Sequence, residues 1–187
     1  MILSVIIPAY NESDYLGITL NKLYEAVDGT SIKSSDWEII VCDNNSTDRT
    51  QNIAKQFGAK VIFEPENQIS KARNKGAEIA TGEWLLFMDA DTYPDLNLMK
   101  DVIRVTKENK LIGCGSTIRV IDGSRFNRLR LERLNPLYRL LNLSGGAFIL
   151  CKKTGFTVIN GFSEDLYAAE EIDFLIKLKK YGKSVGK

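Results

Sequence analysis

The first half of the chain alternates short apolar runs with longer stretches in which apolar residues recur every three or four positions. The short runs are typical of strands buried on both faces, and the longer stretches are typical of amphipathic helices. Strands and helices in alternation indicate right-handed βαβ units around a parallel sheet. We predict strands at 2–7, 37–42, 60–63 and 84–88, and helices at 16–27, between 48 and 58, and at 70–80.

Turn and capping residues mark the ends of these elements. Pro8 is expected to stop the first strand. Asn11, Ser13 or Asp14 is expected to cap the helix that follows, because their side chains can accept a hydrogen bond from a free backbone N–H. Gly58 lies where the second helix is expected to end.

The second half of the chain is richer in arginine and leucine. Helices are predicted near 96–105 and from about 169 to 181, and strands at 111–120 and 148–151. Residues 119–143 hold six arginines against two acids, a net charge of +4. One interpretation of this stretch is an amphipathic helix packed on the sheet. The other is a basic apolar surface for an anionic lipid or a lipid-linked acceptor.

Composition limits the class of protein. The 187 residues are enough for one domain with a sizeable core, and 44% apolar and 26% charged residues are ordinary globular values. The net charge of +1 gives no field that would favour nucleic acid. No stretch approaches the roughly 20 apolar residues that span a bilayer, and the first residues do not resemble a signal peptide. Cys42, Cys114 and Cys151 are expected to be reduced core thiols, which favours a cytoplasmic protein.

Two carboxylates, Asp89 and Asp91, follow the strand predicted at 84–88. Like charges one residue apart cost free energy unless a cation or a set of donors compensates them. One interpretation is a handle for a metal and a phosphate group, and the other is that both residues cap the next helix. Histidine is absent, so metal binding and acid–base chemistry must use carboxylates, hydroxyls, amides and cations.

Polar residues also follow the other predicted strands. Ligands of open parallel sheets bind at this carboxyl edge, which favours a ligand site at the two aspartates. Neither glycine-rich phosphate motif is present, which argues against a Rossmann dehydrogenase or a P-loop enzyme, so the diphosphate of a bound nucleotide would need a metal. Glu64 and Glu66 are expected to be solvated. The residues at the other strand ends are Asn11, Glu12, Asp43, Glu64 and Glu66.

Two further stretches carry signals that the residues alone leave open. Residues 144–147, SGGA, are small and would let the backbone approach a ligand or pack tightly. Residues 164–173 contain five acids and no basic residue. Acids suit the first turn of the helix predicted there, but five acids are more than capping requires.

Six segments, in order and with compatible spacing over nearly the whole chain, resemble family 2 glycosyltransferases. The resemblance implies an α/β GT-A fold, with a Rossmann-like and mostly parallel open sheet flanked by helices. It implies inverting transfer of a hexose-type sugar from a nucleotide-diphospho-sugar donor, with Mn²⁺ or Mg²⁺ as cofactor. The segments are 4–12 (SVIIPAYNE), 41–50 (VCDNNSTDRT), 71–92 (KARNKGAEIATGEWLLFMDADT), 144–156 (SGGAFILCKKTGF), 160–165 (NGFSED) and 170–182 (EEIDFLIKLKKYG).

The resemblance also implies an organisation and a setting. Residues 1–187 would form a single domain, with 1–95 as the nucleotide-sugar-binding half and 96–187 as the acceptor and catalytic half. A glycan or lipid-linked acceptor, cell-envelope polysaccharide or glycolipid synthesis, and contact with the inner face of a membrane through 119–143 are expected. Many GT-A enzymes supply a metal-binding histidine from beyond these motifs, and this chain has none. Water and phosphate oxygens would then complete the metal shell, or the chain lacks a carboxyl-terminal portion.

The resemblance further implies roles for individual residues in the donor site. Asp89, Ala90 and Asp91 match the DXD motif, with Asp91 favoured as the direct metal ligand. Lys71 and Arg73 lie near where the family contacts the donor, although Arg73 could equally be structural. The residues implied to line the nucleoside pocket are Pro8, Ala9, Tyr10 and Glu12, with Asp43 accepting a hydrogen bond from the base.

Glu170 and Glu171 match the family's acidic pair before the last helix. Glu171 stands where an aspartate is often found, and is implied to be the general base that takes the proton of the acceptor hydroxyl. Because a glutamate is one methylene longer, the choice among Glu170, Glu171 and Asp173 stays open. Two other classes of function are compatible with the residues: a sugar-phosphate nucleotidyltransferase, although such enzymes usually have a glycine-rich basic loop after the first strand, and a non-catalytic nucleotide-binding module.

Overall fold

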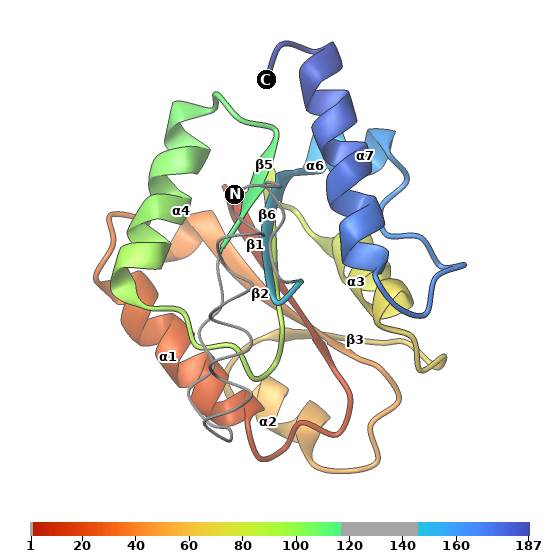
Figure 1. The fold of residues 1–187 in the computed structure, drawn as a ribbon. Helices are drawn as coiled ribbons and strands as arrows, with labels where there is room; N and C mark the ends of the chain where they lie inside the picture. Colours follow the sequence, from red (N-terminus) through yellow and green to blue (C-terminus); the bar gives the residue numbers. More distant parts are fainter. Residues whose placement is uncertain (1, 117–145) are drawn as a thin grey trace, which may run out of the picture.

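A computed structural model describes residues 2–116 and 146–187. Its centre is a six-stranded sheet in the order β3-β2-β1-β4-β6-β5 (Figure 1). β3, β2, β1 and β4 are parallel, whereas β6 runs antiparallel to both of its neighbours, β4 and β5. The strands are β1 Leu3–Ala9, β2 Trp37–Asp43, β3 Lys60–Phe63, β4 Trp84–Met88, β5 Gly113–Gly115 and β6 Phe148–Lys152.

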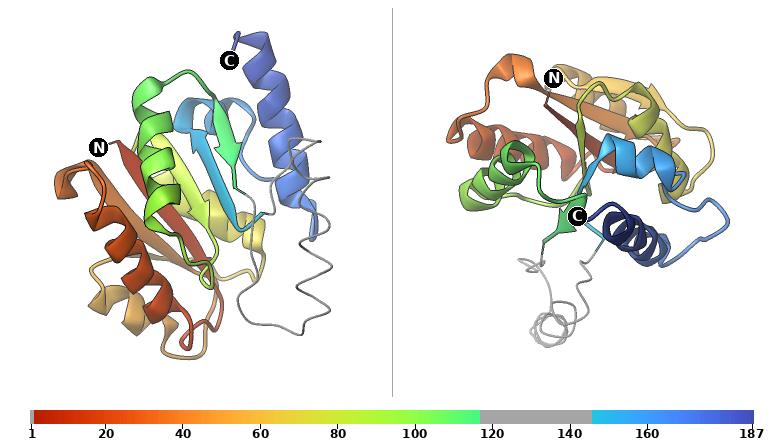
Figure 2. Two further views of the ribbon diagram at one scale, coloured as in Figure 1. Left: turned by 60° about the vertical axis from the view of Figure 1, so that its left-hand side comes forward. Right: turned by 90° about the horizontal axis from the view of Figure 1, so that it is seen from above.

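Helices cover both faces of this sheet, which gives three layers (Figure 1, Figure 2). α1, α2 and α4 lie on one face, and α3, α6 and α7 lie on the other. A short 3₁₀ helix, Ser34–Asp36, precedes β2. The helices are α1 Leu16–Asp28, α2 Thr50–Gln56, α3 Ile69–Ile79, α4 Leu96–Glu108, α6 Lys153–Val158 and α7 Glu170–Ser184.

The two faces of the sheet bury separate clusters of apolar side chains. Successive residues of a strand point to opposite faces, so Val5 of β1 packs toward α1 while its neighbour Ile6 packs toward α3. The second cluster contains four stacked phenylalanine rings, of which Phe87 contributes the one from β4. Because both faces are covered, the central strands are apolar throughout, which explains the short apolar runs of the sequence.

The predicted strands and helices of the first half are confirmed, and the run at 84–88 is β4 itself. The prediction that Pro8 stops the first strand is wrong, since β1 continues to Ala9. β1 pairs with β4 only as far as Ile6, whereas its pairing with β2 runs on to Ala9. One side of Pro8 therefore faces no neighbouring strand, and its missing N–H is tolerated there.

The predicted cap of α1 is also wrong. The helix begins at Leu16 after Tyr15, with no side-chain hydrogen bond at its start. Asn11 and Ser13 are instead bound by side chains of the loop after β2, as described below. α6 was not predicted, and α7 runs through Gly182, whose missing side chain makes room for Ile112.

Part of the second half lies outside the described residues. This applies to the basic stretch 119–143 and to the end of the strand predicted at 111–120, of which β5 forms the described part. Cys42 and Cys151 are buried free thiols and Cys114 is a half-buried one. Within residues 2–116 and 146–187, no helix is long and apolar enough to cross a membrane.

Candidate functional site

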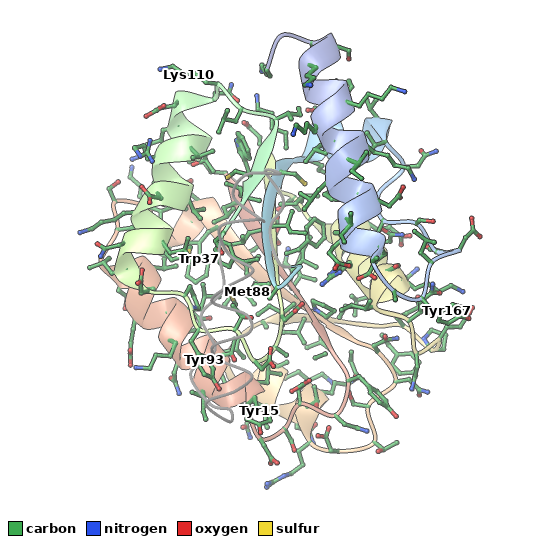
Figure 3. All side chains as sticks on the ribbon, in the orientation of Figure 1. Tyr15, Trp37, Met88, Tyr93, Lys110 and Tyr167 are labelled. Carbon is green, nitrogen blue, oxygen red and sulfur yellow. The ribbon has the colours of Figure 1, made fainter. Side chains whose placement is uncertain are left out.

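The carboxyl ends of the parallel strands meet at one edge of the sheet, which we call the carboxyl edge. β1, β2 and β4 end there at Ala9, Asp43 and Met88. β6 begins there, because it runs antiparallel to β4 and pairs Phe148 with Met88. Figure 3 shows Met88 near the middle of the molecule, between the start of α1 and the loop before α7 that carries Tyr167. The topology thus brings most of the predicted site residues to one edge.

The loop after β1 and the loop after β2 are tied together by hydrogen bonds. The backbone N–H of Asn11 donates to Ser46 Oγ at 3.0 Å, and Asn11 Oδ1 accepts from the Thr47 N–H at 2.8 Å. The N–H of Glu12 donates to Thr50 Oγ1 at 2.8 Å. Asn11 and its counterpart Asn45 have positive φ values of 54° and 68°, which asparagine tolerates. The predicted nucleoside-pocket segment is therefore held in one conformation.

Asp43 lies buried at the end of β2, directly beside this pair of loops. Its Oδ1 accepts from the Ser46 N–H at 3.1 Å, and its Oδ2 lies 3.4 Å from Gln51 Nε2. Tyr10, in contrast, is half exposed, while Pro8 and Ala9 are buried. Each carboxylate oxygen accepts more than one hydrogen bond, so Asp43 keeps the capacity to accept one from a ligand.

Asp89 and Asp91 do not cap the following helix. Asp95 is the cap of α4, because its side chain accepts from the Leu98 N–H. Asp89 donates its own N–H to the Ala147 carbonyl at 3.1 Å, which ties the end of β4 to the start of β6. Asp91 is exposed and makes no hydrogen bond or ion pair with the rest of the described chain. The helix-capping interpretation of the two aspartates is therefore wrong.

Arg73 of α3 lies between the two acidic pairs. Its Nη2 donates to Asp89 Oδ1 at 3.0 Å and its Nη1 donates to Glu170 Oε1 at 2.7 Å. Only 2% of Arg73 is exposed, and its guanidinium lies 5.1 Å from the centre of the Phe162 ring. Asp89 and Glu170, 81 residues apart in the chain by these numbers, are thus joined through one buried cation.

The three acids considered for the general base differ in their partners. Glu170 is buried and paired with Arg73, and Asp173 lies 2.7 Å from Lys177 Nζ one turn along α7. Glu171 makes no ion pair within the described residues. Burial raises the pKa of Glu171, and the negative charge of Glu170 raises it further. Of the three, Glu171 is the carboxylate with a raised pKa and no cationic partner of its own.

Negative charge is concentrated at the carboxyl edge. Burial raises the pKa of Glu12, and the charges of Asp91 and Asp89 add to this effect. Burial also raises the pKa of Asp89, against the opposing effect of Arg73. Carboxylates with raised pKa values and too little compensating charge are typical of functional sites. A divalent cation or an extra donor would relieve this repulsion.

The donor set at Asp89 and Asp91 is compatible with Mg²⁺ or Mn²⁺. Within the described residues, no three Asp, Glu, His or Cys side chains form a complete metal site. Mg²⁺ is usually held by one or two carboxylates together with water and substrate phosphates. Asp91 and the Asp89 oxygen that does not bind Arg73 offer this kind of incomplete shell.

Lys71 lies at the flank of the site rather than at its centre. It forms an ion pair with Glu66. Glu66 is exposed, as predicted, whereas Glu64 is half-buried and accepts from the Glu66 N–H. Asn44 Nδ2 donates to the carbonyls of both glutamates, which fixes the turn after β3.

Sequence reasoning missed three residues that shape the site. Asn74 of α3 holds the loop before α7, since it both donates to the Phe162 carbonyl and accepts from the Phe162 N–H. Gln68 Nε2 donates to the Glu164 carbonyl of the same loop. A Cβ on Gly146 would lie 2.8 Å from Glu171 Cγ, so this glycine makes room for the glutamate. The small residues of 144–147 were a signal for this packing, but the partner was not readable.

A cavity of about 700 Å³ lies at the other edge of the sheet, away from these acids. Thr81, Trp84, Lys152 and Lys153 are among its lining residues. Lys153 Nζ donates to the Ala80 carbonyl and the Lys152 ammonium lies over the Trp84 ring, so these cations already have partners. We assign no part of the candidate site to this cavity.

The comparison with protein families agrees with this geometry. The sequence model described as "Glycosyl transferase family 2" matches residues 4–161, and the chain belongs to this family. An uncharacterised glycosyltransferase from Haemophilus influenzae is 31% identical over 94% of this chain and 61% of its own length. The chain thus spans about three-fifths of this relative.

Two solved structures share the fold. Staphylococcus aureus TarS 1–349 in complex with UDP-GlcNAc matches with a TM-score of 0.72 and 26% identity, over 95% of this chain and 53% of that one. The mannosyltransferase PcManGT from Pyrobaculum calidifontis, in complex with GDP-Man and Mn²⁺, matches with a TM-score of 0.71. Its 20% identity, over 96% of this chain and 52% of that one, supports the fold alone. The predicted GT-A fold is confirmed.

Proposed function

We propose that this chain carries the donor and catalytic site of an inverting, metal-dependent glycosyltransferase. The reaction transfers a sugar from a nucleotide-diphospho-sugar to a hydroxyl of a glycan or lipid-linked acceptor. The observation that carries the proposal is the meeting of two acidic pairs, Asp89 with Asp91 and Glu170 with Glu171, on either side of buried Arg73. Membership of glycosyl transferase family 2 supports it. In this proposal 1–95 is the donor half of one domain and 96–187 the acceptor half.

The donor's nucleoside would bind against the joined loops after β1 and β2. Loops that are already ordered lose little conformational entropy when a ligand binds, and the hydrogen bonds between them support this arrangement. Lys71 would have to leave Glu66 to reach the donor. The residues proposed for this pocket are Pro8, Ala9, Tyr10, Glu12 and Asp43.

The diphosphate would lie at the end of β4. Asp89 and Asp91, on either side of buried Ala90, are the residues that would hold Mn²⁺ or Mg²⁺. A bound divalent cation would neutralise the charge that develops on the diphosphate leaving group. The raised pKa values of Glu12 and Asp89 support a site that gains from added positive charge.

Glu171 is the proposed general base. It would accept the proton of the acceptor hydroxyl while the acceptor oxygen attacks the sugar carbon from the face opposite the diphosphate, which inverts that carbon. A carboxylate with a raised pKa is a stronger base, and base catalysis of this kind contributes about 10²- to 10⁴-fold in rate. Glu170 and Asp173 are already paired with Arg73 and Lys177, which favours Glu171 over both.

The setting is proposed from the relatives. TarS is named a poly(ribitol-phosphate) β-N-acetylglucosaminyltransferase, and a Methanococcus voltae relative is named a glucuronosyltransferase that acts on a dolichyl-linked sugar phosphate. We propose an acceptor of this general kind, a glycan or a lipid-linked sugar of the cell envelope. A cytoplasmic position with membrane contact through 119–143 belongs to the same proposal.

A product assay with UDP-GlcNAc and GDP-mannose tests this function. We expect release of nucleoside diphosphate in the presence of Mn²⁺, and a loss of at least about 10²-fold in Glu171→Gln. Glu64→Gln, the same change on a half-buried glutamate outside the acidic pairs, is the matched control and should retain the rate. A normal rate in Glu171→Gln would contradict the base assignment, and release of pyrophosphate would indicate a nucleotidyltransferase instead.

A further inference from the structure

Arg73 contacts three segments of the chain that converge on the candidate site. It binds Asp89 at the end of β4 and Glu170 at the start of α7. Its Nη2 also lies 3.3 Å from the Gly146 carbonyl, just before β6. A guanidinium has a planar fork of N–H donors, which lets one side chain bind several acceptors at fixed angles. The three segments are therefore held at fixed positions relative to α3.

The burial of Arg73 argues against direct contact with a bound donor. The residue is 2% exposed, and the Phe162 ring lies against its guanidinium. Its Nε is buried without a hydrogen-bond partner among the described residues. A guanidinium enclosed in this way offers no surface to a diphosphate. Any effect of Arg73 on the reaction must pass through the groups that it binds.

Two of those groups determine where Glu171 lies. Glu170 is its neighbour in the first turn of α7, and Gly146 is the residue on which its side chain packs. Arg73 binds the carboxylate of the first and the carbonyl of the second. A shift of Arg73 would therefore displace Glu171 and Asp89 together.

We propose that Arg73 is a positioning residue that sets the distance between the donor end of the site, at Asp89, and the acceptor end, at Glu171. Glu170 acts with it as the anchor of α7 and is not itself the base. This inference rests on the proposed function. Displacements of about 1 Å at a reacting centre can cost 10²-fold in rate, so a fixed spacing is a kinetic requirement.

The variants Arg73→Lys and Glu170→Gln test the proposal, with Arg104→Lys on the exposed face of α4 as the matched control. Lysine keeps the charge but is a point donor that cannot bridge both carboxylates. With UDP-GlcNAc or GDP-mannose and Mn²⁺, we expect kcat per folded molecule to fall at least tenfold in Arg73→Lys. The donor KM should change by less than about threefold, and Arg104→Lys should leave both constants unchanged.

A double variant separates positioning from two independent effects. If Arg73 acts through Glu170, the loss of kcat in Arg73→Lys/Glu170→Gln should be clearly smaller than the product of the two single losses. Arg73→Lys should also retain more activity than Arg73→Ala, because one ion pair survives. If Arg73→Lys does not fold, Glu170→Gln alone carries the test, since it leaves Arg73 paired with Asp89.

Each other outcome overturns a distinct claim. A raised donor KM with normal kcat would make Arg73 a donor ligand, and unchanged constants per folded molecule would make it purely structural. Fully multiplicative losses in the double variant would separate Arg73 from Glu170. A wild-type chain that neither binds nor turns over either donor would overturn the proposed function, and the positioning role with it.

Discussion

The two edges of the parallel sheet both bury carboxylates, and they treat them in opposite ways. At the amino edge, Glu38 of β2 accepts from Ser4, from Thr81 and from Lys60. Burial alone would raise its pKa, but these hydrogen bonds outweigh burial and lower the pKa to about 2. At the carboxyl edge, burial and like charges raise the pKa values of Glu12, Asp89 and Glu171.

The difference separates structural acids from functional ones. Glu38 fastens β1, β2, β3 and the turn before β4 to one another, and its oxygens are satisfied. The carboxyl edge keeps more negative charge than Arg73 compensates. Active sites commonly retain groups that destabilise the fold because the reaction needs them. The predictions below test this contrast.

The largest expected change in stability is that of Glu38→Ala. It leaves the Thr81 N–H and the Ser4 hydroxyl without their acceptor in a buried site, and orphaned groups of this kind cost about 1–3 kcal/mol each. We expect the free energy of unfolding to fall by about 3–4 kcal/mol in urea denaturation. Glu25→Ala, which removes an exposed ion pair on α1, should change it by less than about 0.5 kcal/mol. A loss below about 1 kcal/mol in Glu38→Ala would mean that the amino edge is not held by this residue.

Acid should remove the same contribution in the wild type. The pKa of Glu38 is lower in the folded chain, about 2 against 4.5, so its contribution is present above pH 4.5 and is lost as the pH falls toward 2. At 1.36 kcal/mol for each unit of pKa, it amounts to at most about 3 kcal/mol. Urea denaturation between pH 6 and pH 2.5 should show this loss, and Glu38→Gln should lack it. An equal pH dependence in both would contradict the assignment.

Neutralising an acid at the carboxyl edge should have the opposite sign. Glu171→Gln removes a half-buried charge whose pKa is raised, so it relieves repulsion from Glu170. We expect the free energy of unfolding to rise by about 0.5–1 kcal/mol, although the reaction is lost. A loss of stability above about 1 kcal/mol would identify Glu171 as a structural acid like Glu38.

The smallest effect concerns backbone strain beside the same acids. Ala169, directly before Glu170, has a φ of 61°, a conformation that costs a residue with a Cβ about 1 kcal/mol or more. Ala169→Gly relieves this strain but frees the unfolded chain, so a net gain of about 0.5 kcal/mol is expected. Gly58→Ala, at a φ of 74° with open space around it, is the converse control and should destabilise. A loss of stability in Ala169→Gly would show that the conformation is not strained.

The sequence was sufficient for the elements that are set by local pattern and by topology. The apolar run of β4 predicted its own bounds, because a strand covered on both faces must be apolar throughout. The alternation of strands and helices predicted that Asp43, Asp89 and Asp91 would share an edge. Asp173 and Lys177, one turn apart, are a pair that spacing alone can suggest.

Contacts between distant segments were not predictable in this way. The side chains of Ser46 and Asp48 took the N–H groups that the expected caps would have served, and this required the two loops to meet first. Arg73 and Glu170 are 97 residues apart, so their pairing follows from the packing of α3 against α7. The role of Gly146 depends on the position of Glu171, which the sequence does not fix.

The most direct test of the account is the thermal stability of the wild type and of Asp91→Asn with UDP, UDP-GlcNAc and GDP-mannose, each with and without Mn²⁺. A ligand at a hundredfold excess over its dissociation constant adds about 2.7 kcal/mol, or about 5–10 °C in Tm for a chain of this size. We predict a Mn²⁺-dependent rise in the wild type for at least one nucleotide, and its loss in Asp91→Asn. No shift with any of the three, or an equal shift in Asp91→Asn, would contradict a nucleotide-sugar site at the end of β4.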